Sequence, residues 1–158
     1  MTIKIFTQTE CNYRHIQEVI GMMPTATREL DTNAKPDTIR ALSAITTAVT
    51  GANPNLFFAV AESDGVTTGF MVGAMANFLL ENRLLAQDIL LYVMPDHRGN
   101  GVASELIQAF AAWSKEKGAC EARIGLMSSV TEAALTTVTE ELGFTKAGMV
   151  VAFKHGGA

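Results

Sequence analysis

Apolar residues in the first third of the chain follow strand spacing and then helix spacing. Residues 2–7 alternate apolar and polar side chains, which predicts a strand. Apolar side chains recur at helical spacing over residues 13–20, which predicts a helix that the segment 21–24, Gly-Met-Met-Pro, should end. A second helix is predicted over residues 36–51, because a proline suits a first helical turn and an apolar stripe follows it. That stripe consists of Ile39, Leu42, Ile45 and Val49.

The clearest turn signal in the chain lies between residues 56–62 and residues 66–75. Both segments are rich in residues that favour strands. The intervening Ser63-Asp64-Gly65 contains residues that adopt left-handed backbone angles. We therefore predict a β-hairpin here.

The second half of the chain alternates strand and helix patterns. Strands are predicted over residues 88–93, 121–126 and 144–153. Helices are predicted over residues 102–117 and 129–143, the second of them opened by capping-box spacing and ended by a glycine. Their inward faces consist of Val102, Leu106, Phe110 and Trp113 in the first helix and of Leu135, Val138 and Leu142 in the second.

The predicted elements follow the order β-α-α-β-β-β-α-β-α-β. This order is typical of an α/β (α+β) layer in which helices cover a mixed, largely antiparallel sheet. The 158 residues are 48% hydrophobic and 18% charged, which suffices for one sizeable core and leaves little material for a second. We therefore expect a single domain over residues 1–158.

The charge balance disfavours a nucleic-acid partner. There are 12 Lys and Arg against 16 Asp and Glu, so the net charge of -4 gives no overall positive field. The N-terminal residues are too soon interrupted by polar side chains for a signal peptide, and no later apolar run reaches membrane-spanning length. We expect a cytoplasmic protein that binds neither nucleic acid nor membrane.

Cysteines and histidines are too dispersed to predict a metal site. Cys11 and Cys120 lie far apart and outside any Cys-x-x-Cys spacing, so we expect two buried free thiols in a reducing compartment. His15, His97 and His155 are equally scattered along the chain.

The segment that carries chemistry is Arg98-Gly-Asn-Gly-Val-Ala103, between a predicted strand and a predicted helix. Its glycines allow the backbone to approach a ligand without Cβ clashes. The unpaired amides of the first helical turn point at an anion, with the helix dipole behind them. Such a loop suits a pyrophosphate, and the alternative is that the glycines only shape a tight connection.

Two other phosphate-binding loops fit this segment poorly. A P-loop needs Gly-x-x-x-x-Gly-Lys followed by Ser or Thr, and no Lys lies at the required place. The dinucleotide fingerprint Gly-x-Gly-x-x-Gly lacks its third glycine, because Ser104 stands there.

At this loop the sequence resembles the GNAT superfamily of acetyl-CoA-dependent N-acetyltransferases. The family signature is Arg or Gln, two residues, Gly, one residue, then Gly or Ala, and Arg98, Gly101 and Ala103 fill it in register. The resemblance extends upstream through residues 91–98 and downstream to Glu140-Glu-Leu-Gly-Phe144. It implies a GNAT-like fold and an acyltransferase.

The resemblance also implies a division of labour along the chain. Residues 88–153 would be the acetyl-CoA-binding half, and residues 1–87 would be the acceptor-side half. The pantetheine arm would lie along residues 91–93, in a gap beside the strand predicted at 121–126. The implied acetyl-CoA-binding residues are Leu91, Tyr92, Val93, Arg98, Gly99, Asn100, Gly101, Val102, Ala103 and Ser104.

By the same resemblance, Val93 and Asp88 would take part in the reaction. The Val93 backbone amide would stabilise the oxyanion that forms when an amine attacks the acetyl carbonyl. A protonated amine cannot attack, so a general base is needed, and Asp88 is the candidate, directly or through a water. Regular alternation would place Asp88 on one face with Leu90 and Tyr92, and a solvated strand-end carboxylate is the alternative interpretation.

The sequence departs from the family where the leaving thiolate is reprotonated. Many members use a Tyr just before the segment that resembles residues 140–144, whereas this chain has Thr139. A Thr hydroxyl is short and weakly acidic, so it is a poor replacement. Tyr92 has the right chemistry and is a catalytic candidate, with strand packing as its alternative role.

The function implied is transfer of an acetyl group from acetyl-CoA to a primary amine, by direct attack in a ternary complex. The amine would belong to a small molecule, a peptide or a protein, and family members commonly form homodimers. Thr139 motivates a second hypothesis, an acyl-CoA-binding module of the same fold with little or no turnover. A structural α/β domain whose loop binds nothing is a third.

Overall fold

The computed structural model describes residues 2–30, 35–77, 82–125 and 136–146. The chain divides into two units, Met1–Ile124 and Gly125–Ala158. The first unit contains, in chain order, β1 (Ile3–Thr7), the short helix η1 (Gln8–Glu10), α1 (Tyr13–Leu30), α2 (Thr38–Val49), β2 (Leu56–Ser63), β3 (Val66–Asn77), β4 (Leu84–Val93), the short helix η2 (Pro95–His97), α3 (Val102–Glu116) and β5 (Glu121–Arg123).

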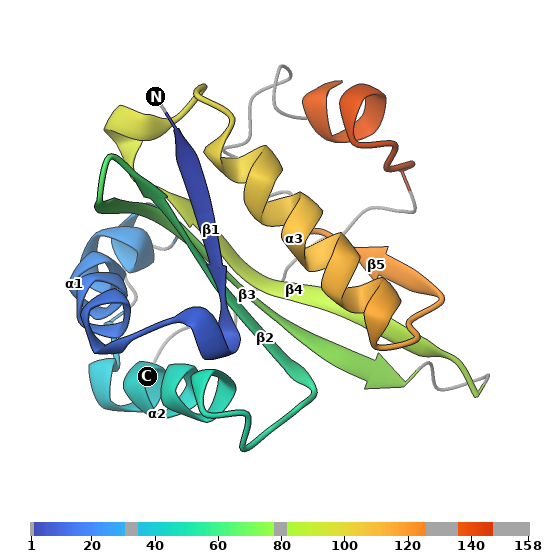
Figure 1. The fold of residues 1–158 in the computed structure, drawn as a ribbon, viewed down its shortest axis with the longest axis horizontal. Helices are drawn as coiled ribbons and strands as arrows, with labels where there is room; N and C mark the ends of the chain where they lie inside the picture. The colour runs from blue at the N-terminus through green and yellow to red at the C-terminus, as the bar shows by residue number, and fades with distance from the viewer. Residues whose placement is uncertain (1, 31–34, 78–81, 126–135, 147–158) are drawn as a thin grey trace, which may run out of the picture. The chain divides into compact units, whose positions relative to one another are not determined.

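The five strands of the first unit form one sheet in the order β1-β2-β3-β4-β5 (Figure 1). Neighbouring strands are antiparallel from β1 to β4, and only β4 and β5 are parallel. Helix α3 covers one face of the sheet, and α1 and α2 pack on the other. The prediction of a mixed, largely antiparallel sheet flanked by helices is confirmed.

The core under α3 is built around three aromatic rings. The Phe57 ring centroid lies 5.4 Å from that of Phe110 and 5.2 Å from that of Trp113. Phe110 and Trp113 stack at 5.9 Å between centroids. All four side chains predicted for the inward face of this helix are buried, namely Val102, Leu106, Phe110 and Trp113.

The predicted hairpin is present between β2 and β3. Asp64 has φ of +52° and Gly65 has φ of +83°. Two consecutive positive φ angles match the twist of paired strands, and Asp and Gly adopt them readily. The hairpin predicted from the turn residues is therefore confirmed.

Helix α1 does not end at Pro24, as the sequence predicted, but continues through it to Leu30. A proline inside a helix removes one backbone hydrogen bond and costs about 3 kcal/mol. The apolar stripe continues beyond it, because Val19, Met23 and Ala26 all pack into the core on this face of the sheet. Burial of that stripe offsets the cost of Pro24.

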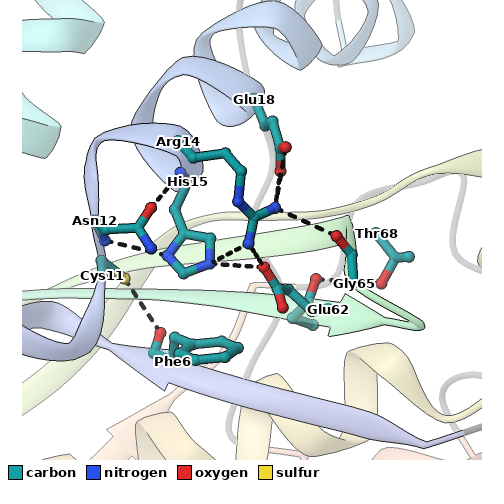
Figure 2. Close-up of polar contacts among 10 residues, drawn as sticks. Phe6, Cys11, Asn12, Arg14, His15, Glu18, Glu62, Gly65 and Thr68 are labelled. Carbon is teal, nitrogen blue, oxygen red and sulfur yellow. Dashed lines mark hydrogen bonds and ion pairs between the residues drawn. The ribbon is translucent and has the colours of Figure 1, made fainter.

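Two hydrogen bonds and an ion-pair cluster fix the first turn of α1 (Figure 2). The Asn12 side chain accepts from the His15 amide at 3.2 Å, and His15 Nδ1 accepts from the Asn12 amide at 3.2 Å. His15 Nε2 lies 2.7 Å from Oε1 of the buried Glu62 on β2, which Arg14 also contacts. Burial opposes the charge of Glu62, but Arg14 and His15 lower its pKa overall. This cluster anchors α1 to the sheet.

Helix α2 begins at Thr38, two residues later than Pro36, because the Asp37 side chain caps it by accepting the Arg40 amide at 3.0 Å. Its buried face also differs from the predicted stripe. Ile45 is buried, but Ile39 is 82% exposed. Val49 packs against the same core as Ile45, so only the first half of the predicted stripe, Ile39 and Leu42, is exposed.

The remaining strands and helices differ from the predictions mainly at their ends. β4 begins four residues earlier than the predicted strand 88–93, and β5 ends at Arg123, before residue 126. In the second unit, a short helix η3 (Thr137–Glu141) overlaps the predicted helix 129–143, and Gly143 follows it with φ of +73°. The start of that helix and most of the predicted strand 144–153 lie outside the described residues.

The two thiols differ in environment. Cys11 is buried, and burial together with the nearby Glu10 charge raises its pKa to about 12. Cys120 is exposed, so the prediction of a second buried thiol is wrong. Within the described ranges, no helix combines the length and apolar character needed to cross a membrane.

Candidate functional site

The loop that joins β4 to α3 has the backbone form expected of an anion site. Gly99 and Gly101 have φ of +78° and +83°, which glycine adopts without strain. Gly101 is the N-cap of α3, where no described side chain caps the helix. The first helical bond runs from the Glu105 amide to the Gly101 carbonyl at 3.1 Å. The amides of residues 102–104 precede that bond and are the ones a ligand can cap.

The peptides on both sides of Val93 are oriented by β3. The Met94 amide donates to the Thr68 carbonyl at 2.9 Å, and the Tyr92 carbonyl oxygen lies 2.8 Å from the position that a Cβ on Gly69 would take. The amide and carbonyl of a trans peptide point in opposite directions. The Val93 amide and carbonyl therefore both point away from β3, toward the side of β4 where β5 lies.

β4 and β5 pair only over a short stretch. Their register runs from Leu85 opposite Glu121 to Gln87 opposite Arg123, and no later pair joins β4 to another described strand on this side. Just beyond it, Ile89 is the extra residue of a β-bulge, because Asp88 lies opposite Gly73 and Leu90 lies opposite Val72. A bulge bends its strand and turns it away from a neighbour. The Val93 amide thus belongs to the part of β4 beyond its pairing with β5.

The bulge overturns the predicted shared face of Asp88, Leu90 and Tyr92. Gly73 and Val72 are consecutive on β3, so the residues opposite them point to opposite faces of the sheet. Leu90 and Tyr92 belong to the core beneath α1 and α2. Asp88 lies opposite Gly73, which approaches Phe110 of α3. Its carboxylate accepts a hydrogen bond from Gln87 Nε2 at 2.7 Å.

The Arg98 guanidinium contacts the protein through two of its nitrogens. Its Nε donates to the Val93 carbonyl at 2.9 Å, and its Nη2 lies 2.5 Å from Oε2 of Glu29. The guanidinium carbon lies 5.7 Å from the centre of the Tyr92 ring. Glu29 is in the last turn of α1, 69 residues away in sequence. No signal in the sequence linked it to this loop.

Tyr92 is nearly buried between these charged groups. Its hydroxyl donates to Oε1 of Glu29 at 3.4 Å. Burial raises the Tyr92 pKa, the Glu29 charge raises it further, and the Arg98 charge opposes the rise. The phenol is therefore protonated at neutral pH.

The other predicted ligand-binding residues divide between core and surface. Val102 is buried and Leu91 and Ala103 are half-buried in the core under α3, so Val102 can offer a ligand only its backbone. Gly99, Asn100 and Gly101 are exposed, and Ser104 is half-buried. In the second unit, the Thr139 hydroxyl donates to the Thr136 carbonyl at 3.3 Å. No group of three potential metal ligands occurs within the described ranges.

Comparison with known proteins identifies the family. The sequence matches the acetyltransferase (GNAT) family over residues 20–144, and the chain belongs to this family. It is therefore an acetyltransferase that uses acetyl-CoA as its cosubstrate, as the sequence predicted. No curated protein matches the sequence.

Solved structures share the fold at low sequence identity. One is the aminoglycoside acetyltransferase AAC(6')-Iy with a bisubstrate analogue (TM-score 0.73, 21% identity, covering 98% of this chain and 99% of that one). Another is the soil-metagenome aminoglycoside acetyltransferase meta-AAC0020 with sisomicin (TM-score 0.71, 20% identity, covering 97% of this chain and 95% of that one). A third is the ribosomal-protein-alanine N-acetyltransferase of Brucella melitensis (TM-score 0.68, 18% identity, covering 98% of this chain and 100% of that one). At such identities these likenesses show the fold alone.

Proposed function

We propose that this acetyltransferase transfers the acetyl group to a primary amine by direct attack in a ternary complex, with the Val93 amide stabilising the oxyanion. The observation that carries the proposal is the direction of that amide, away from β3 and beyond the pairing of β4 with β5. A fixed backbone donor of this kind acts without reorganising during the reaction.

The loop between β4 and α3 would hold the pyrophosphate of acetyl-CoA. The support is the uncapped first turn of α3 and the positive φ of Gly99 and Gly101, which leave the amides of residues 102–104 for an anion. The pantetheine arm would lie along Leu91 to Val93, on the side of β4 toward which the Val93 amide points. Arg98, Asn100 and Ser104 would complete the site.

Asp88 would act as the general base, directly or through a water. Asp88 lies beside the bulge, directly after the last residue of β4 that pairs with β5, and five residues before Val93. The hydrogen bond from Gln87 stabilises the carboxylate form that accepts a proton. Tyr92 would be the proton source for the leaving thiolate, because its phenol is protonated at neutral pH.

We place the acceptor site in residues 1–87 and the acetyl-CoA site in residues 88–153 of one cytoplasmic domain. The acceptor would be a primary amine on a small molecule or a protein. Distant structural relatives include aminoglycoside and ribosomal-protein acetyltransferases, which makes both classes reasonable probes. The homodimer that the family resemblance implies is part of the same proposal and would be read from the mass in solution.

Thiol release from acetyl-CoA with a panel of amines tests the proposed reaction. The panel contains sisomicin, a peptide with an N-terminal alanine and simple polyamines. We expect at least one amine to accelerate CoA release and to gain one acetyl group by mass spectrometry. Acetyl-CoA binding without acceleration by any amine would contradict the transfer step and would favour a binding module.

A further inference from the structure

Glu29 joins the last turn of α1 to the end of β4 through two contacts. One carboxylate oxygen lies 2.5 Å from Nη2 of Arg98, and the other accepts from the Tyr92 hydroxyl at 3.4 Å. Arg98 in turn lies over the Tyr92 ring. The three side chains thus form a closed set of contacts, the α1 clamp, between the acceptor-side half and the loop.

The α1 clamp contacts both residues of the peptide bond that carries the Val93 amide. That amide belongs to the peptide between Tyr92 and Val93. The clamp holds the Tyr92 side chain through Glu29 and Arg98, and it holds the Val93 carbonyl through Arg98 Nε at 2.9 Å. β3 fixes the other side of the same backbone. The direction of the Val93 amide therefore depends on both the α1 clamp and β3.

An exposed ion pair by itself stabilises a fold little, by about 0 to 1 kcal/mol. Glu29 and Arg98 are 35% and 48% exposed, and the Glu18 and Arg14 pair on the same helix is 35% and 45% exposed. The two pairs are therefore comparable in exposure. They differ in what the arginine touches, because only Arg98 also binds the backbone of Val93.

We infer that Glu29 is a positioning residue for acetyl transfer, acting through Arg98 and Tyr92 on the Val93 amide. The inference rests on the proposed function, in which that amide meets the acetyl carbonyl. It also means that the last turn of α1, in the acceptor-side half, controls the backbone at the acetyl-CoA site. Glu29 itself need not touch either substrate.

The first test compares the affinities of acetyl-CoA and free CoA, which differ only in the acetyl group. In the wild type, a hydrogen bond from Val93 should favour acetyl-CoA about five- to tenfold, as measured by calorimetry. Glu29→Gln keeps the size of the side chain and removes its charge, so this preference should fall to about twofold or less. Glu18→Gln, the matched control, should keep the wild-type preference.

The second test reads the clamp directly and needs no ligand. The chain has 2 tyrosines, so Tyr13→Phe leaves Tyr92 as the only phenol, and its ionisation is followed by ultraviolet absorbance. Burial is the largest cause of the raised Tyr92 pKa. The charged groups that face the phenol are Glu29 from α1 and Arg98 from the loop. In this background, Glu29→Gln should lower the Tyr92 pKa, Arg98→Gln should raise it, and Glu18→Gln should leave it unchanged.

The outcomes separate the inference from the proposed function. If Glu29→Gln keeps the full preference for acetyl-CoA, Glu29 does not position the Val93 amide. If the wild type has no preference, the Val93 amide does not bind the acetyl carbonyl, and the proposed role of that amide fails. An unchanged Tyr92 pKa in Glu29→Gln would contradict the contact itself. If the wild type binds neither acetyl-CoA nor CoA, the proposed function fails and the inference fails with it.

Discussion

Val93→Pro should lower turnover about 100- to 1,000-fold, the loss typical of removing one oxyanion donor. Proline lacks the backbone N–H, and at this position the missing hydrogen would not have bonded to β3, because the Val93 amide points away from that strand. The sheet ladder should therefore survive the substitution. The measurement is the rate of thiol release with the best amine of the panel.

Val93→Ala is the matched control for this variant. It also removes the buried side chain but keeps the amide, so it should retain most of the wild-type rate. Far-ultraviolet circular dichroism would show that both variants fold. Equal rates in Val93→Pro and the wild type would show that the amide takes no part in catalysis.

Gly73→Ala should destabilise the protein by about 2 to 3 kcal/mol, as overpacking of a tight core does. A Cβ at this position would lie 2.5 Å from Cε2 of Phe110 and 3.2 Å from the Gln87 carbonyl. Phe110 cannot easily retreat, because it is fully buried and packs against Phe57 and Trp113. The free energy of unfolding in urea measures the effect.

Gly21→Ala makes the same chemical change where the structure has room. Gly21 lies in α1 with nothing within 4 Å of its Cβ position, so alanine should stabilise the helix by about 0.5 to 1 kcal/mol. The free energy of unfolding should therefore fall in Gly73→Ala and rise in Gly21→Ala. If Gly73→Ala were as stable as the wild type, the close approach of Phe110 on α3 to Gly73 on β3 would be wrong.

Local signals in the sequence predicted the elements whose structure depends on local chemistry. Asp64 and Gly65 need positive φ and gave the hairpin, and the buried face of α3 followed from helical spacing. The loop from Arg98 to Ala103 was identified because its glycines and the helix start are adjacent in sequence.

Features that depend on tertiary packing could not be predicted. Pro24 should have ended α1, but the core under that helix kept it continuous. The bulge at Ile89 depends on its partner strand, so the faces of Asp88 and Tyr92 were assigned by an alternation that the bulge interrupts. Glu29 is 69 residues from Arg98, and only the fold brings the two together.

Calorimetric titration of acetyl-CoA into the wild type and into Arg98→Glu/Gly101→Glu tests the central claim most directly. Two carboxylates at the loop would repel the pyrophosphate, and a glutamate at position 101 would be strained at φ of +83°. We predict micromolar binding by the wild type, as is common for enzyme substrates, and no measurable binding by the variant. Equal binding by both proteins would show that acetyl-CoA does not use this loop.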